Sequence, residues 1–437
     1  MKKLTLFFVS IYTIWMFPQD TVNLDLRKSV ELALEYNHDL RLVQFEREKA
    51  QERIREAWGS SVFPKINGRI DYSRAVMRSV FTLDAPPPFG GTFPQGTLNT
   101  MTLGATLEQP LFTGAIFLAV RIARTYADIS AKIVDATRSE LIVNVKQAYY
   151  SVLLSKEVLN LSKLNLTLAE DNLKNTKAMY DAGVVPEYDY IRAKVEVQNL
   201  VPELLQAENS LKLSYNLLKL VTGMQLDRNI KINDSLIFKE ISADTVDEND
   251  LLERNYSLKQ MQLQIKLQDD AVSYEFTKHF PELYFVGNWG AIAQENDLNS
   301  FGSWHYNNSI YAGLNLKIPI FDGFQTTSKV EQARIDLSKA EEDYSKSEEL
   351  AKNQFQEVLL NIRQTREKID SYKAGIDEAQ LGYEIANKRY KSGMGTQLEN
   401  VDALVSLSRA KVNYYTAVYD YYLYHARLDQ LLAKENY

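Results

Sequence analysis

The chain has 437 residues, of which 45% are hydrophobic and 24% charged, a composition that excludes a disordered tail and a helical membrane bundle. Acidic residues (57) outnumber basic residues (50), and the net charge of −7 argues against a nucleic-acid binder, which needs a basic stripe. There is no cysteine, so disulfides, thiolate catalysis, cysteine-ligated zinc and a lipid-modified N-terminal cysteine are excluded.

The N-terminus predicts a secreted protein. Lys2 and Lys3 precede a 14-residue apolar run over residues 4–17, which is short for a spanning helix and typical of a signal peptide over residues 1–19. No small-x-small triplet marks a cleavage site, so a retained membrane anchor is the alternative. No later stretch has eighteen uninterrupted apolar residues, so any further membrane crossing requires β-strands.

The remaining sequence is an internal duplication. Four short segments recur in the same order, 34–41 at 252–259, 63–66 at 280–283, 110–114 at 319–323 and 180–183 at 390–393. The offset falls from 217 to 209 between the second and third matches, because the first copy carries eight more residues there. We therefore divide the chain into a first repeat at 20–223, a mixed equatorial segment at 224–248 and a second repeat at 249–437.

Each repeat opens with a helix-period segment, at about 26–58 and 249–278. Two strand-period segments follow, and prolines bound the strand pair because proline breaks helices and lacks a ladder donor. Apolar and polar residues alternate at 66–73, 101–108 and 310–318, whereas 283–291 is blurred. Segments of about ten alternating residues are typical of transmembrane barrel strands, and two sheets of a soluble protein are the alternative.

Four strands cannot close a barrel alone, so we expect several chains to share one. The loop after the first strand is rich in proline and glycine around residues 86–96, which predicts a surface loop on the cell exterior.

A long helix-period stretch follows each strand pair, at 115–181 and 325–391, with 67 residues each and no proline. At a rise of ~1.5 Å per residue, each helix would be roughly 100 Å long. A second helix follows each long one, at 187–221 and 397–433, and Pro202 is expected to kink the first of them.

This duplicated helix–strand–strand–helix–helix plan resembles the TolC-type outer-membrane efflux protein family. The segments Gln109–Gly114, Ile318–Gly323 and Arg389–Ala403 carry the resemblance locally, and it covers essentially the whole mature chain. It implies an α+β membrane protein, a homotrimer whose 12-stranded β-barrel, four strands per chain, continues as a long α-helical barrel of coiled coils.

The resemblance also implies a function and a set of partners. The trimer would be a passive export duct in outer-membrane lipid, with an iris-like periplasmic gate. Substrates would reach it from an inner-membrane transporter of the RND, ABC or MFS type through a periplasmic membrane-fusion adaptor. No cofactor is implied, and the cargo is left open between drugs, metal ions and polypeptides.

The candidate gate lies where the long helices reverse, at Gly183 and at Gly393 with Gly395, because glycine allows the left-handed turn of a helix C-terminus. Glu399 and Asp402 follow at i and i+3, on one helix face. The resemblance places them on an acidic constriction ring of six carboxylates in a trimer. An ordinary N-terminal helical turn, which favours acidic residues, explains the same pair.

The family's second gate element links a tyrosine and an arginine to an aspartate beyond the first turn. Tyr390 and Asp189 occupy the tyrosine and aspartate places, whereas Gly395 occupies the arginine place. Arg389 would project from another face. We therefore expect a closed tip that depends more on packing than on a charged latch.

Enzyme motifs are absent from the sequence. Residues 91–96 begin like a phosphate loop but lack its lysine, and the four histidines have no metal-ligand spacing. Six tyrosines between residues 414 and 424 indicate inter-helix packing and a membrane-proximal belt. The sequence thus predicts no catalytic or metal site. A periplasmic coiled-coil structural or adaptor protein is the alternative, and it would not need two strand pairs at equivalent places.

Overall fold

The computed structural model describes residues 22–241, 247–298 and 301–435, so the expected signal peptide lies outside the described residues. The chain forms two compact units, and each takes corresponding stretches from both repeats. In the described residues the first unit combines 22–42, 136–255 and 350–435, and the second combines 43–135 and 256–349. Each unit is described separately below.

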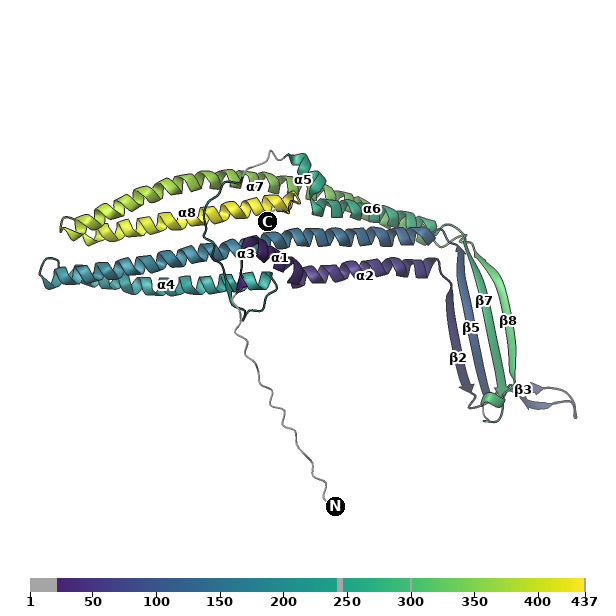
Figure 1. Cartoon of the computed structure of the whole chain (residues 1–437). Coiled ribbons are helices and arrows are strands. Elements are labelled where there is room, and N and C mark those ends of the chain that lie inside the picture. Colours follow the sequence, from purple (N-terminus) through teal and green to yellow (C-terminus); the bar gives the residue numbers. More distant parts are fainter. Residues whose placement is uncertain (1–21, 242–246, 299–300, 436–437) are drawn as a thin grey trace, which may run out of the picture. The chain divides into compact units, whose positions relative to one another are not determined.

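The second unit contains an antiparallel sheet of four strands in the order β2-β5-β7-β8 (Figure 1). The strands are β2 (Lys65–Arg74), β5 (Asn99–Phe112), β7 (Glu282–Glu295) and β8 (Tyr306–Lys317). These are the four strands that the alternation predicted. β2 and β8 form the two edges of this sheet, each paired on one side within the chain.

The strand register places most apolar residues on one face of the sheet and most polar residues on the other, with Val286 and Ile292 as exceptions on the polar face. Directly paired residues share a face, and one face carries Ile66, Ile70, Leu103, Leu107, Leu283, Phe285, Trp289, Ile310, Leu314 and Leu316. The other face carries Asn67, Arg69, Thr102, Thr106, Glu108, Asn288, Asn315 and Lys317. The apolar face is open to solvent in the single chain, since Ile70 is 73% exposed and Ile310 79%. The register also resolves the blurred segment, with Leu283 and Phe285 on the apolar face.

The loop between β2 and β5 contains a second, two-stranded ribbon that the sequence analysis missed. β3 (Val80–Leu83) pairs antiparallel with β4 (Gly91–Pro94), and Phe81 lies opposite Phe93. Three prolines and Gly90 lie in the connection over residues 84–90, and Gly91 and Pro94 lie within β4, so the composition hid the ribbon in the sequence. A short 3₁₀ turn, Phe301–Ser303, lies between β7 and β8.

The first unit contains two antiparallel helical hairpins (Figure 1). α3 (Ile116–Asp181) turns back into α4 (Glu187–Val221), and α7 (Gln325–Lys391) turns back into α8 (Gln397–Leu431). α4 and α8 have 35 residues each, and α3 and α7 have 66 and 67, as expected of a duplication. Pro202 lies inside α4, which is assigned as one helix throughout.

The helices that open the repeats are each interrupted by an asparagine. The prediction of unbroken helices at 26–58 and 249–278 was wrong, because α1 (Leu26–Tyr36) and α2 (His38–Ser61) are separate, as are α5 (Glu248–Arg254) and α6 (Tyr256–Thr277). The separating residues, Asn37 and Asn255, have extended ψ angles of 132° and 121°.

These two asparagines make equivalent long-range hydrogen bonds. Nδ2 of Asn37 donates to the carbonyl oxygen of Val221 at 2.9 Å, and Nδ2 of Asn255 donates to that of Leu431 at 3.1 Å. Val221 and Leu431 are the last residues of α4 and α8, whose final carbonyls have no partner within their own helices. Each asparagine therefore pins the end of one hairpin, and we call the pair the asparagine pins.

The core of the first unit lies where α3, α4, α7 and α8 meet the mixed segment. β1 (Val22–Asn23) pairs in parallel with β6 (Ile230–Lys231), and buried residues beside it include Tyr149, Val152, Leu218, Ile369, Val418 and Tyr421. The hydroxyl of Tyr422 donates to the Ile237 carbonyl oxygen at 2.8 Å, and that of Tyr421 accepts from the Ile241 N–H at 3.2 Å. The C-terminal tyrosines therefore pack between helices and hold the mixed segment.

Candidate gate at the hairpin tips

The two hairpin turns have the same backbone geometry. Gly183 and Gly393 have φ angles of 73° and 75°, in the left-handed region that glycine enters without strain. In each turn the glycine N–H donates to the carbonyl three residues earlier, and the next N–H donates to the carbonyl five residues earlier, at 2.8–3.0 Å. This is a Schellman motif, which satisfies carbonyls at the helix end and reverses the chain.

Gly395 fits tightly against the preceding end of α7. Its N–H donates to the Arg389 carbonyl oxygen at 3.1 Å. A Cβ atom at position 395 would lie 3.0 Å from Arg389 Cβ and 3.1 Å from the Tyr390 backbone nitrogen. An arginine therefore cannot occupy this place unless the turn moves.

The acidic pair lies exposed in the first turns of α8. Thr396 is the N-cap residue, and its Oγ1 accepts from the Glu399 N–H at 3.2 Å. Nη2 of Arg389 lies 4.0 Å from Oε2 of Glu399 and donates to the Met394 carbonyl oxygen at 3.3 Å. Arg389 therefore faces the acidic pair of its own hairpin and partly compensates the charge of Glu399, whereas Asp402 lacks such a partner within the described chain.

Tyr390 forms a hydrogen bond with Thr176 of the first hairpin. Only 3% of Tyr390 is exposed, and its hydroxyl lies 2.6 Å from Oγ1 of the fully buried Thr176 on α3. Burial raises the pKa of Tyr390, and the nearby Asp189 carboxylate raises it further. That carboxylate, in the first turn of α4, has no hydrogen bond or ion pair within the part of the chain that the structure describes. Tyr390 and Asp189, which occupy the family's tyrosine and aspartate places, thus lie close together, but no hydrogen bond joins them directly.

A second buried residue that bridges the two hairpins was missed by the sequence analysis. Gln397, the first residue of α8, is 1% exposed. In the amide orientation that satisfies both neighbours, its nitrogen donates to the Asp189 carbonyl oxygen at 3.0 Å and its oxygen accepts from the Ala193 N–H at 3.0 Å. One turn later, Nδ2 of Asn400 donates to Oδ1 of Asn172 at 3.4 Å. In the sequence, Thr396–Glu399 looks like an ordinary capping box, which gives no sign of this contact.

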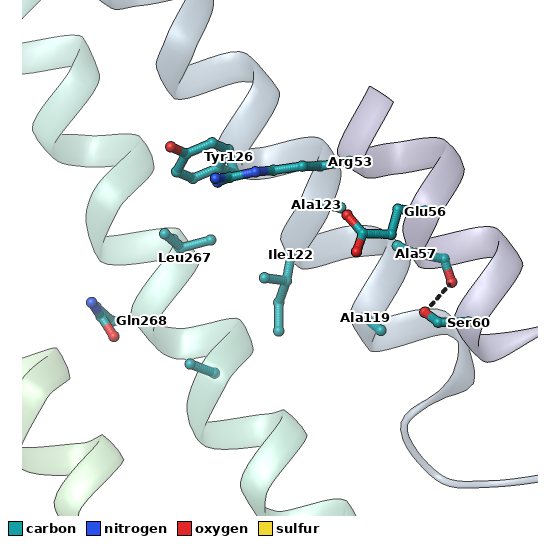
Figure 2. Close-up of a pocket in the computed structure, with 11 residues that line it drawn as sticks. Arg53, Glu56, Ala57, Ser60, Ala119, Ile122, Ala123, Tyr126, Leu267 and Gln268 are labelled. Atoms are coloured by element: carbon teal, nitrogen blue, oxygen red, sulfur yellow. Dashed lines mark hydrogen bonds between the residues drawn. The ribbon is translucent and has the colours of Figure 1, made fainter. Parts of the chain in front are cut away.

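The second unit contains a groove of about 460 Å³ among α2, α3 and α6 (Figure 2). The guanidinium of Arg53 lies 4.7 Å from the centre of the Tyr126 ring, a cation–π contact, and Oγ of Ser60 donates to the Ala57 carbonyl oxygen at 3.3 Å. The lining is mostly small or apolar, and no histidine is among its lining residues. The contacts of these side chains, a cation–π pair and a bond within α2, do not place a nucleophile beside a base.

Two searches of the described residues bear on other site classes. Histidines, aspartates and glutamates do not gather there in any group of three or more that could hold a metal ion. Among the same residues, no helix is long and apolar enough to cross a membrane.

The fold combines an amphipathic four-stranded sheet that has unpaired edges with two long helical hairpins. The sequence model for "Outer membrane efflux protein" matches residues 29–224 and 249–434. The chain therefore belongs to the outer membrane efflux protein family, and it is an outer-membrane protein.

Individual relatives agree with this assignment. The outer membrane protein TolC of Vibrio cholerae is 25% identical over 76% of this chain and 77% of its own length. TolC of Escherichia coli is 22% identical over 92% of this chain and 80% of its own length. The crystal structure of the Campylobacter jejuni CmeC outer membrane channel has the same fold, with a TM-score of 0.79, 22% identity and coverage of 93% of this chain and 85% of that one.

Proposed function

We propose that three copies of this chain close a shared 12-stranded barrel in the outer membrane and act as a passive export duct. The observation that carries the proposal is the sheet, whose apolar face is exposed and whose edges, β2 and β8, are open. Open edges are not tolerated in lipid, because each unpaired N–H and carbonyl there costs several kcal/mol. Pairing β2 of one copy with β8 of the next removes the edges and directs the apolar face to lipid.

The helices would continue the barrel as a tunnel through the periplasm. α3 and α7 each begin a few residues after a barrel strand and end at a tip turn, so one helix joins the two regions in each repeat. The duct would receive substrates from an inner-membrane transporter through a periplasmic adaptor, and the tips would form an iris-like gate. Glu399 and Asp402 would line it, with Asp189 and Tyr390 behind them.

Electron microscopy of the detergent-solubilised full chain tests the proposal. End-on views should show three-fold particles, and side views a short barrel with a helical tube of roughly 100 Å. The same preparation should conduct ions in a planar lipid bilayer. Soluble monomers or solid rods without conductance would refute the duct, and a periplasmic structural or adaptor protein would take its place.

A further inference from the structure

Among the described residues, the hydrogen bonds between the two hairpins at the tip are all made by uncharged groups. The amide of Gln397 reaches the Asp189 carbonyl oxygen and the Ala193 N–H, each at 3.0 Å. These two backbone groups are four residues apart, the spacing of one α-helical hydrogen bond, so the amide lies along a single turn of α4. The Tyr390–Thr176 and Asn400–Asn172 contacts extend the same interface onto α3.

The charged side chains of the tip do not take part in this interface. Arg389 is directed to Glu399 and Met394, which belong to its own hairpin. Asp189 contributes its backbone carbonyl, whereas its carboxylate forms no ion pair in the described chain. Separating the hairpins therefore breaks neutral hydrogen bonds and leaves the Arg389–Glu399 pair intact.

We infer that Gln397 is the latch of the closed tip, a positioning residue that holds the α7–α8 hairpin against α4. Two features favour this residue over its neighbours. Its amide supplies both a donor and an acceptor, so it bonds the carbonyl at one end and the N–H at the other end of a single turn of α4. The Thr396 cap fixes the start of α8, so Gln397 is presented to α4 by a rigid helix end.

The burial of Gln397 makes its loss consequential. An amide that is 1% exposed has no water to replace its two backbone partners while the tip stays closed. Opening the tip hydrates all of these groups, so a side chain without the amide should lower the preference for the closed state. This inference rests on the proposed function, because it takes the tip as the gate of a duct.

Conductance in a planar phospholipid bilayer, measured on the full chain, tests the latch. Gln397→Leu keeps the approximate size but removes the amide, and Gln397→Glu keeps the shape but removes the donor. Gln397→Leu loses both hydrogen bonds and should raise the occupancy of the open state about tenfold. Gln397→Glu loses the bond to the Asp189 carbonyl and sets a carboxylate oxygen against it, so it should raise the occupancy as well. The control is Gln198→Leu, an exposed position on α4, which should behave as wild type. Wild-type conductance in both Gln397 variants would overturn the latch.

A cross-link separates the latch from a general loss of stability. The chain has no cysteine, so Ala193→Cys with Gln397→Cys creates a single reactive pair at the proposed contact. A short reducible thiol cross-linker should keep this variant in the low-conductance state, and a reductant should then open it. Equal conductance before and after reduction would overturn the latch. If the wild-type chain forms no three-fold particles and no channel, the proposed duct itself is refuted. If the wild-type chain forms a channel that the Gln397 variants leave unchanged, only the latch is refuted.

Discussion

The two faces of the sheet make a prediction that can be tested with adjacent residues. Ile310 lies on the apolar face of β8 and Ser309 on its polar face, and both are exposed in the single chain. Exposed substitutions on a water-facing sheet change stability by about 0.5 kcal/mol or less. If the apolar face contacts lipid, arginine at position 310 has to be buried in hydrocarbon, whereas arginine at 309 faces the lumen.

The expected magnitude follows from the position of Ile310 within the strand. It is the fifth of the 12 residues of β8, near the middle of the strand. An arginine at the bilayer midplane of a barrel costs ~2–4 kcal/mol, so Ile310→Arg should cost roughly 6–12 kcal/mol in a trimer. The assay is refolding into phosphatidylcholine vesicles, with the trimer fraction read from gel mobility without boiling.

Ser309→Arg is the matched control, because it introduces the same side chain one residue away. It should assemble nearly as well as wild type, while Ile310→Arg should leave little trimer. If both variants assemble equally, the apolar face does not contact lipid, and the reasoning from the strand register is wrong.

Three further predictions concern the first unit. Asp189→Ala should change bilayer conductance by less than about twofold, because its carboxylate has no partner in the described chain; a large opening would contradict the neutral latch. Asp402→Asn should lower cation over anion selectivity more than Glu399→Gln, because Arg389 already compensates Glu399; reversal potentials in a salt gradient measure this, and the opposite order would contradict it. Burial lowers the pKa of His425 below its ordinary value of 6.5. The folded chain then binds fewer protons than the unfolded chain, so stability should fall as pH drops below about 6.5. Thermal unfolding at pH 7.5 and 5.5 should show this for wild type, and a shift as large in His425→Gln would contradict it.

Much of the fold could be predicted from the sequence because its signals are local and repeated. The four sheet strands have a period of two, and the strand register agrees with it at Ile66 and Ile310. The long helices end at glycines that the left-handed turn requires, Gly183 and Gly393. The duplication strengthened each assignment, since a weak signal in one repeat had a counterpart in the other.

The missed features depend on contacts between distant residues. Asn37 and Asn255 each stand inside a helix-period stretch. Oδ1 of Asn37 accepts from the Leu40 N–H at 3.0 Å as a local cap, but the bonds of both asparagines to the carbonyls of Val221 and Leu431 depend on distant residues. The β3–β4 ribbon was hidden by the prolines and glycines that lie within β4 and in the connection between the two strands.

The positions of the hairpin tips could be predicted from the sequence, but their hydrogen bonds could not. The tip glycines and the acidic pair stand out in the sequence, and the structure brings Tyr390 and Asp189 to the same tip. Gln397 follows a cap threonine and looks unremarkable, because its function depends on a backbone turn roughly two hundred residues earlier. Local patterns carry no information about such a partner.

The asparagine pin at Asn255 gives α8 the mechanics of a lever. The pin holds the helix at Leu431, and the contact of Gln397 with α4 lies at the opposite end of 35 residues. At ~1.5 Å per residue the lever arm is about 50 Å, so a tilt of about 4° displaces the free end by about 3.5 Å. That displacement exceeds what a hydrogen bond tolerates. A tilt of a few degrees about the Asn255 pin would therefore be enough to break the contact of Gln397 with α4.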